Sequence, residues 1–274
     1  MQPGMISSIS EWEPLVEELS QYAKVILYNR AGCGKSERGT KTRNLNENAK
    51  DLHTLIHKLE LNDPILIGHS YGGLIVQYFA IHYPNIARSL ILVDSTSVDA
   101  HLLDEVEIEG GDETSTRAWI QKCKEYATLS KEHLQVEMEG WIETLKKKLP
   151  LQTHNEISEH MSNPYMFEIL GEELEHDPFY MKELKVQLDG FPDLPTIVIG
   201  RDPEVSIKQM LEHEGLEIRE AEEIERIWQS LIQEQTNLNS QTEYMLARGS
   251  SHDIHKEKPK QILNLACSLL DMTY

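Results

Sequence analysis

The chain has 274 residues, and its 26 Lys and Arg residues are outnumbered by 46 Asp and Glu residues, which gives a formal net charge of −20 at pH 7. This length is sufficient for one large α/β domain, or two small ones, with a sizeable core. The negative charge repels phosphate backbones and anionic lipid headgroups, so the composition argues against nucleic acid and membranes as partners.

The cysteines and the N-terminus bear on the cellular setting. Cys33, Cys123 and Cys267 are odd in number, widely spaced and not arranged as CxxC, which argues against a disulfide framework and a zinc knuckle. The N-terminus lacks a basic region followed by an apolar one, and no stretch approaches the roughly 18 to 20 apolar residues that span a bilayer. We therefore expect a reduced, cytoplasmic protein, whose oligomeric state the sequence leaves open.

From residue 24 to residue 95, short apolar runs alternate with amphipathic segments. The apolar runs KVILYN (24–29), PILIGHS (64–70) and SLILVDS (89–95) are bounded by turn signals. The segments between them, ENAKDLHTLIHKLEL and LIVQYFAIHY, have helical character. This alternation is typical of buried parallel strands joined by crossover helices.

Near residue 97 the sequence pattern changes to long polar stretches with helical periodicity, and near residue 191 the alternation of strand-like and helix-like segments returns. A strand is predicted at 194–200, a long amphipathic helix at 217–235, a strand at 243–247 and a closing helix at 258–272. We therefore predict one α/β core made of residues 1–96 and 191–274, interrupted by a helical insertion at 97–190.

The segment Gly68-His69-Ser70-Tyr71-Gly72 joins a predicted strand directly to a predicted helix. Small residues around a serine permit a sharp turn that projects its hydroxyl above the sheet. Ser70 is therefore the candidate nucleophile, and the N–H of Tyr71, at the helix N-terminus, is a candidate oxyanion donor. We expect His69 to pack beside the turn rather than to act as a base.

The chain resembles the alpha/beta-hydrolase family in five segments that keep the family's order and spacing. They are YNRAGCGKS (28–36), IGHSYGG (67–73), SLILVDS (89–95), LPTIVIGRDP (194–203) and ARGSSHDIHKEKP (247–259). The resemblance implies an alpha/beta-hydrolase fold, a parallel sheet with flanking helices, in which residues 97–190 stand in the place of the family's variable helical cap. It also implies a hydrolase that needs no cofactor.

The same resemblance supplies candidates for the base and for the acid that orients it. His252, in GSSHDIH after the last predicted strand, matches the position of the family's histidine. Two carboxylates end strands on the correct side of the sheet: Asp202 follows VIGR, and Asp94 ends SLILVD. We favour Asp202 and keep Asp94 as the alternative acid.

Three other patterns suggest phosphate or metal binding without meeting its requirements. A phosphate loop ending in Gly34-Lys35-Ser36 requires a glycine where Asn29 stands. The segment HNEISEH (154–160) lacks the spacing of a zinc motif, and His255 has no third ligand at suitable spacing. We expect no metal, with His255 facing solvent at a helix entry and Cys33 serving as a small turn residue.

A complete alpha/beta-hydrolase has three further strands before the one expected at 24–29, whereas this chain offers only MQPGMISSIS before EWEPL. Gly4 and Met5 could be the remnant of the loop that supplies the second oxyanion donor, which makes the Met5 N–H a candidate. Either the true start lies upstream or the chain is a natural truncation. Because losing an oxyanion donor slows catalysis, we expect weak or absent activity from residues 1–274 alone.

The sequence thus predicts a hydrolase of a small ester, amide or lactone that works through a Ser-His-Asp triad and an acyl-enzyme. The alternative is a hydrolase-like binding or signalling protein, or a truncated remnant, that keeps the pocket without turnover. The substrate's identity stays open. The insertion carries large apolar side chains that could line the substrate pocket or form the insertion's own core: Trp119, Trp141, Tyr165, Met166 and Phe167.

Overall fold

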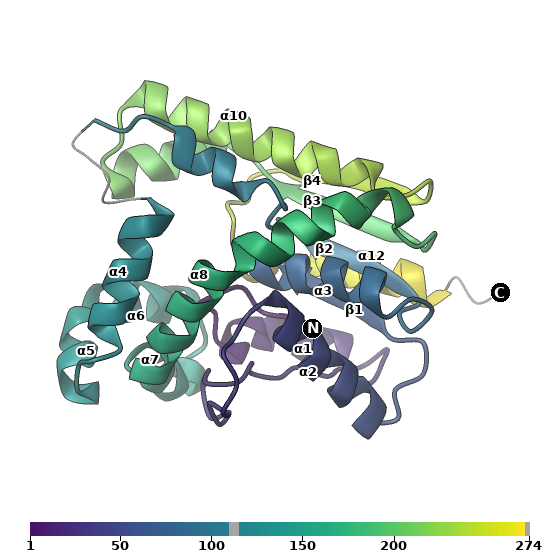
Figure 1. Ribbon diagram of the computed structural model, residues 1–274, viewed down its shortest axis with the longest axis horizontal. Helices are drawn as coiled ribbons and strands as arrows, with labels where there is room; N and C mark the ends of the chain where they lie inside the picture. Colours follow the sequence, from purple (N-terminus) through teal and green to yellow (C-terminus); the bar gives the residue numbers. More distant parts are fainter. Residues whose placement is uncertain (110–114, 272–274) are drawn as a thin grey trace.

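The computed structural model describes residues 1–109 and 115–271. Its centre is a parallel sheet of four strands in the order β1-β2-β3-β4 (Figure 1). The strands are β1 (Ile65–His69), β2 (Ser89–Val93), β3 (Thr196–Arg201) and β4 (Thr242–Ala247). Apolar runs rich in Ile, Leu and Val favour strands that are buried on both faces. All four strands lie where the sequence predicts them.

Helices connect these strands and cover the sheet. In chain order they are α1 (Glu13–Leu19), α2 (Leu45–Lys58), α3 (Tyr71–His82), α4 (Thr116–Tyr126), α5 (Lys131–Glu137), α6 (Glu139–Lys148), α7 (His154–Met161), α8 (Pro164–Gln187), α9 (Pro203–Gln209), α10 (Ile218–Glu234), α11 (Ile254–Glu257) and α12 (Pro259–Asp271). Within the described ranges, none of them combines the length and the apolarity that crossing a bilayer demands.

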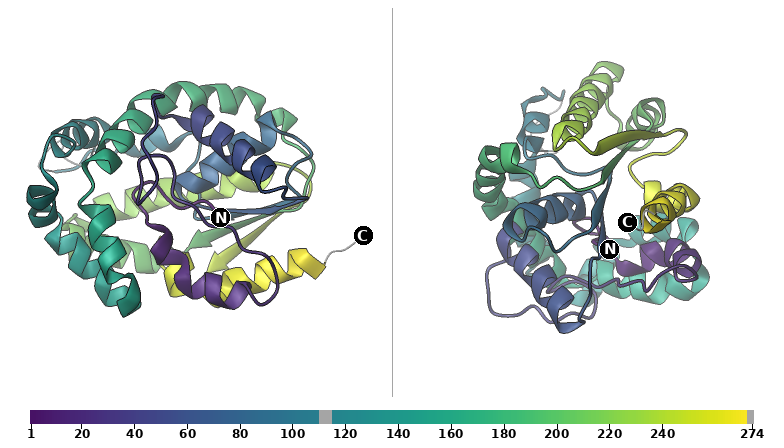
Figure 2. Two further views of the ribbon diagram at one scale, coloured as in Figure 1. Left: turned by 90° about the horizontal axis from the view of Figure 1, so that it is seen from below. Right: turned by 90° about the vertical axis from the view of Figure 1, so that its right-hand side faces the viewer.

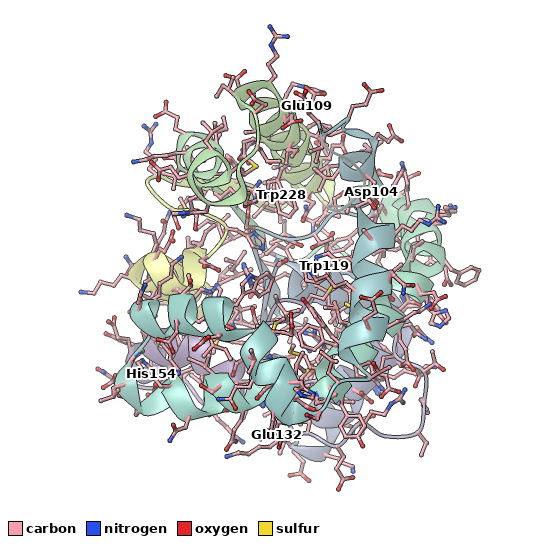
Figure 3. The ribbon with its side chains drawn as sticks, turned by 90° about the vertical axis from the view of Figure 1, so that its left-hand side faces the viewer. Asp104, Glu109, Trp119, Glu132, His154 and Trp228 are labelled. Carbon is pink, nitrogen blue, oxygen red and sulfur yellow. The ribbon has the colours of Figure 1, made fainter. Side chains whose placement is uncertain are left out.

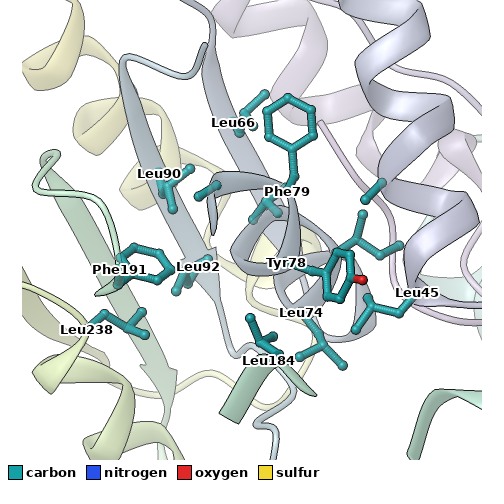
Figure 4. Close-up of a cluster of buried hydrophobic side chains, with 14 of the residues drawn as sticks. Leu45, Leu66, Leu74, Tyr78, Phe79, Leu90, Leu92, Leu184, Phe191 and Leu238 are labelled. Carbon is teal, nitrogen blue, oxygen red and sulfur yellow. The ribbon is translucent and has the colours of Figure 1, made fainter. Parts of the chain in front are cut away.

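The two faces of the sheet bury separate clusters of side chains. Leu66, Leu90 and Val198 pack on one face against α2, α3 and α10, while Ile91 and Ile199 pack on the other against α1 and α12. Successive residues of a strand point to opposite faces, so each apolar run supplies both clusters. Figure 2 shows the helices on the two sides of the sheet, and Figure 4 shows the first cluster, in which Phe79 of α3 lies close to Leu66.

The predicted insertion contains the helices α4 to α8. These helices share a cluster of buried side chains that includes Cys123, Leu134, Met161 and Phe167. The long helix α8 also reaches the core, where Leu184 joins the cluster that packs against α3. The boundaries of the insertion stay predictions, and residues 110–114 and 272–274, which fall in the predicted insertion and in the predicted core, lie outside the described residues.

The strand predicted at residues 24–29 is wrong, since the structure assigns no strand there. Gln2 lies beside β1, with a single parallel bridge to Gly68, and the amine of Met1 donates a hydrogen bond to the carbonyl of Ile26 at 2.7 Å. The first residues of the chain therefore separate the segment 24–29 from β1. The segment consequently has no neighbouring strand with which to form a ladder.

Candidate active site

Ser70 occupies the sharp turn between β1 and α3. Its backbone dihedrals are φ 51° and ψ −123°, a conformation that L-residues rarely adopt. The Ser70 N–H donates to the carbonyl of Val93 at 3.0 Å, and the Ser70 carbonyl accepts from the N–H of Thr96 at 3.1 Å. These bonds tie the strained turn to β2 and the residues that follow it. Strain held in this way is a feature of functional turns.

The glycines around Ser70 are required by close packing. A Cβ on Gly68 would overlap the backbone of Gly72, one on Gly72 would overlap the carbonyl of Gln2, and one on Gly73 would overlap the side chain of Ser95. No other residue type fits these positions without a shift of the backbone or of a packed neighbour. The steric condition that the sequence predicts for the turn is met at these glycines.

His252 makes its side-chain contact with Asp94. Its Nδ1 donates to Oδ2 of Asp94 at 2.6 Å, and the Asp94 carboxylate is completely buried. Burial would raise the pKa of Asp94, but the hydrogen bond from His252 and the nearby charges of His252 and Arg201 hold it below its ordinary value. The acid beside the imidazole is therefore ionised, as the partner of a general base must be.

The preference for Asp202 over Asp94 is not supported by this geometry. The Asp202 carboxylate accepts the N–H of Glu204 at 3.1 Å, which caps α9, and the N–H of Gly249 at 2.7 Å. Both carboxylates follow neighbouring parallel strands, so both lie at the same edge of the sheet. Asp202 is turned toward the loop backbone, whereas Asp94 is turned toward the imidazole of His252.

His69, which precedes Ser70 in the chain, contacts His252. The Nε2 of His69 donates to the carbonyl of His252 at 2.9 Å, and the centroids of the two rings are 4.5 Å apart. The Ser70 hydroxyl has no hydrogen-bond partner among the residues that the structure describes. Bonds between a nucleophile and its base are often long in enzymes without substrate and tighten when substrate binds.

Two histidines beside the site are buried and neutral. Burial, reinforced by the nearby charge of His252, lowers the pKa of His69 to about 3. His255 is 0% exposed and stacks on Trp12 with ring centroids 4.5 Å apart, so the prediction that it faces solvent is wrong. The helix α11 on which it lies turns its side chain inward, against Trp12 and His69. His69 is a packing residue, as expected.

The two candidate oxyanion donors flank the turn. The N–H of Tyr71 belongs to the first residue of α3, where backbone N–H groups have no acceptor within the helix. On the other side, a Cβ placed on Gly4 would lie 3.4 Å from Cβ of Ser70, which puts the segment ending in Met5 against the serine. Their roles as donors stay predictions.

A set of residues behind Asp94 escaped the sequence analysis. Oδ1 of Asp94 accepts the N–H of Arg201 and the indole N–H of Trp228, each at 3.1 Å. The Arg201 guanidinium lies 4.4 Å from the ring of Trp228 and is paired with the buried Glu225. The available signals were the tryptophan in the predicted helix 217–235 and the arginine directly before Asp202.

The large side chains of the insertion divide between its core and its surface. Met166 and Phe167 are buried among the helices α4 to α8, whereas Trp141 and Tyr165 are 47% and 58% exposed. Trp119 is partly buried and packs edge-on against Trp141. Figure 3 views this end of the molecule and labels Trp119 on α4. The structure therefore does not gather these side chains into one pocket wall.

Nothing in the described ranges, 1–109 and 115–271, groups three His, Cys, Asp or Glu side chains in a way that could hold a metal ion. Cys33 is buried, and its burial raises the pKa of its thiol to about 11. A protonated thiol is a poor nucleophile. Cys33 thus behaves as a small packed residue, which leaves Ser70 as the nucleophile candidate in this region.

Several known proteins are similar to this chain in sequence or in fold. The uncharacterized protein YqjL from Bacillus subtilis is 22% identical over 267 residues, which cover 97% of this chain and 79% of that protein. A 2-(acetamidomethylene)succinate hydrolase from Mesorhizobium japonicum is 31% identical over 105 residues, 38% of each chain. The solved structure of a hydrolase from Pseudomonas aeruginosa matches with a TM-score of 0.67 at 15% identity, covering 98% of this chain and 88% of that one.

Two further curated hydrolases match over 114 and 93 residues, and the chain spans 41% and 30% of their length, respectively. The pattern that defines the family described as "alpha/beta hydrolase fold" matches residues 1–151, more than half of the chain. That stretch includes the Ser70 turn and Asp94. Fold, turn geometry and this match lead to one conclusion: the chain belongs to the alpha/beta-hydrolase family.

Proposed function

We propose that the protein is a serine hydrolase that cleaves a small ester, amide or lactone through an acyl-enzyme. The observation that carries the proposal is the 2.6 Å hydrogen bond from His252 to the buried Asp94, beside the strained turn of Ser70. In this proposal Asp94 takes the place that the sequence analysis gave to Asp202. Ser70 as nucleophile, His252 as base and Asp94 as the acid that orients the base would together form a catalytic triad.

The proposed reaction begins when the Ser70 hydroxyl attacks the carbonyl carbon of the substrate and passes its proton to Nε2 of His252. Asp94 accepts the hydrogen bond from Nδ1 and stabilises the imidazolium that forms. The N–H groups of Tyr71 and Met5 receive the oxyanion. The imidazolium then protonates the leaving group, and a water molecule, deprotonated by His252, hydrolyses the acyl-enzyme to release the acid and restore Ser70.

The choice of hydrolysis at a carbonyl rests on the nucleophile. A serine at position 70 argues against epoxide or haloalkane substrates, which members of this family attack with a carboxylate. The relative named for 2-(acetamidomethylene)succinate supports hydrolysis as the reaction class and leaves the substrate of this chain open. A small-molecule substrate is consistent with the acidic surface, which disfavours polyanionic partners.

Active-site labelling tests this proposal. The full chain is treated with a fluorophosphonate probe and the modified residue is located by mass spectrometry, while hydrolysis of p-nitrophenyl acetate is followed in parallel. We expect the label on Ser70, no label in Ser70→Ala, and little in His252→Ala. His154→Ala, on α7, serves as the matched histidine control and should label like the original chain.

The outcomes separate the two functions that the sequence allows. Labelling that depends on both Ser70 and His252, together with turnover, supports the hydrolase. A folded chain whose Ser70 stays unlabelled contradicts the proposal and favours a binding or signalling protein. The expectation of weak activity from residues 1–274 stays a prediction, and the same assay gives the rate that tests it.

A further inference from the structure

Arg30 is a buried cation beneath the first residues of the chain. Its side chain is 4% exposed, and its guanidinium donates to three consecutive carbonyls: Pro3 at 2.9 Å, Gly4 at 3.0 Å and Met5 at 2.8 Å. A planar guanidinium offers donors in a fixed fork, so it fixes the direction of each carbonyl that it binds. One side chain therefore sets the backbone conformation of residues 3 to 5.

Fixing these carbonyls also fixes the N–H groups of the same peptide units. In a trans peptide the carbonyl of one residue and the N–H of the next point in opposite directions. Since the Gly4 carbonyl points at Arg30, the Met5 N–H points away from it. In the part of the chain that the structure describes, this N–H has no acceptor, and the neighbouring Gly4 packs against Ser70.

Arg30 also contacts the residue that carries the other candidate donor. Its guanidinium carbon lies 5.1 Å from the centre of the Tyr71 ring, a cation–π contact. The Tyr71 hydroxyl accepts a hydrogen bond from the side-chain amide of Asn48 at 3.0 Å. Tyr71 is 2% exposed, so its side chain is held on both sides. Arg30 thus contacts the residues on both sides of the Ser70 turn.

The anion that balances Arg30 comes from the helical insertion. Oε1 of Glu173, on α8, lies 3.4 Å from Nε of Arg30 and accepts from the amide of Asn48 at 2.7 Å. Burial opposes the charge of Arg30, but the Glu173 carboxylate holds its pKa above the ordinary value. One turn later, burial and the neighbouring Glu173 raise the pKa of Asp177 to about 8, so the Asp177 carboxyl is mostly protonated at neutral pH.

We propose that Arg30 is the positioning residue of the oxyanion site, and that Glu173 makes this site depend on the seating of α8. The inference rests on the proposed function, since it concerns the groups that would receive the oxyanion. It adds a route by which the helical insertion acts on catalysis without touching the substrate. A substitution at Arg30 should therefore weaken stabilisation of the transition state more than binding of the substrate.

Two readouts on Arg30→Lys test the inference. The first is steady-state hydrolysis of p-nitrophenyl acetate, for which we expect kcat to fall by on the order of 10²-fold while KM changes less than about threefold. The second needs no activity: the chain is labelled with ¹⁵N-methionine, and the Met5 amide is assigned by its absence in Met5→Leu. We expect its order parameter to fall from about 0.85 toward 0.6, while that of Met245 in β4 is unchanged.

Arg38→Lys is the matched control, because Arg38 also pairs with carboxylates of α8, Glu168 and Glu172, at a partly exposed position. It should leave both readouts unchanged. Glu173→Gln keeps Arg30 and the side-chain shape, and should lower kcat by about tenfold with a smaller loss of order at Met5. This variant also carries the test if Arg30→Lys does not fold, as judged by circular dichroism.

An unchanged order parameter at Met5 in both variants overturns the inference, and so does an unchanged kcat in a chain that turns over. If the original chain has no turnover, the proposed function fails, while the order parameter of Met5 still decides whether Arg30 holds this segment.

Discussion

The carboxylate of Asp202 accepts the backbone N–H of Gly249 at 2.7 Å, and the Asp202 N–H donates to the carbonyl of Ser250 at 2.8 Å. These two bonds join the end of β3 to the loop that carries His252. Asp202 therefore shapes the backbone of this loop, while Asp94 contacts the imidazole itself. The two carboxylates thus make different contacts at the same edge of the sheet, and substituting each one separately should have different effects on activity.

Replacing each acid by its amide should affect activity very differently. Asp94→Asn removes the charge that stabilises the imidazolium and should lower kcat by about 10³ to 10⁴-fold. Asp202→Asn keeps an acceptor for Gly249 and should change kcat by less than about tenfold, with a loss of about 1 kcal/mol in the free energy of unfolding. Ester hydrolysis and urea unfolding measure the two effects. A larger loss of kcat in Asp202→Asn would show that the acid is assigned wrongly.

Breaking the pair between Arg201 and Glu225 should destabilise the fold. The Glu225 side chain is 2% exposed, so Arg201→Met leaves a buried charge without its partner, at a cost of about 3 to 5 kcal/mol. The double variant Arg201→Met/Glu225→Met should recover much of this loss. Urea unfolding of the original chain and of these variants measures the changes in the free energy of unfolding.

The control for this pair lies on the same helix, α10. Arg226 pairs with Glu223 at an exposed position, and Arg226→Met should leave the unfolding midpoint unchanged. Equal effects of Arg201→Met and Arg226→Met would contradict the importance given to burial.

Two glycines of similar burial should respond in opposite ways to alanine. In Gly68→Ala the new methyl group would overlap the backbone of Gly72, which should lower the free energy of unfolding by more than about 2 kcal/mol. In Gly171→Ala the methyl group would meet only Cβ of Cys123 at 3.4 Å, and the helix α8 should gain about 0.5 to 1 kcal/mol. Thermal unfolding compares them, and a tolerated Gly68→Ala would argue against a tightly closed turn.

Stability should fall as the pH drops below about 6.5, the ordinary pKa of histidine. The pKa of His255 in the folded protein lies well below that value, because its ring is buried. Below about pH 6.5 the unfolded chain therefore binds a proton at His255 that the folded chain does not bind. The free energy of unfolding then decreases toward low pH by about 1.4 kcal/mol per pH unit for each such histidine. His69 contributes with the same sign.

The variant His255→Phe isolates one of these contributions. It keeps the ring stacked on Trp12 and cannot be protonated, so between pH 8 and pH 5.5 it should lose about 1.4 kcal/mol less than the original chain. Urea unfolding at the two pH values makes the comparison. Parallel pH dependences of the two proteins would indicate that His255 takes up protons equally in the folded and unfolded states, so that burial does not lower its pKa.

The sequence was sufficient to predict most of the sheet, because strands such as β2 and β3 are apolar on both faces and stand between clear turn signals. It failed at residues 24–29, where the residues have strand character. A strand needs a neighbouring strand, and the segment beside residues 24–29 is set by the path of Met1 and Gln2. Local composition does not contain that path.

In the candidate site, too, some features follow from the sequence and others depend on contacts between distant segments. Ser70 follows from the local pattern of its turn and His252 from the family resemblance, and their catalytic roles stay proposals. The choice between Asp94 and Asp202 depends on how two side chains turn at neighbouring strand ends, which no spacing encodes. The inward turn of His255 and the three carbonyls held by Arg30 likewise arise from contacts between segments far apart in the sequence.

The contacts that assemble this site are among the longest in the chain: 158 residues separate His252 from Asp94, and 183 separate it from His69. During synthesis, Ser70 and its turn leave the ribosome long before the imidazole that would activate it. In the proposed mechanism, the serine of a nascent chain has no base until the loop after β4 has folded against Asp94. Hydrolytic activity would then report on completion of the whole fold rather than on the integrity of any one segment.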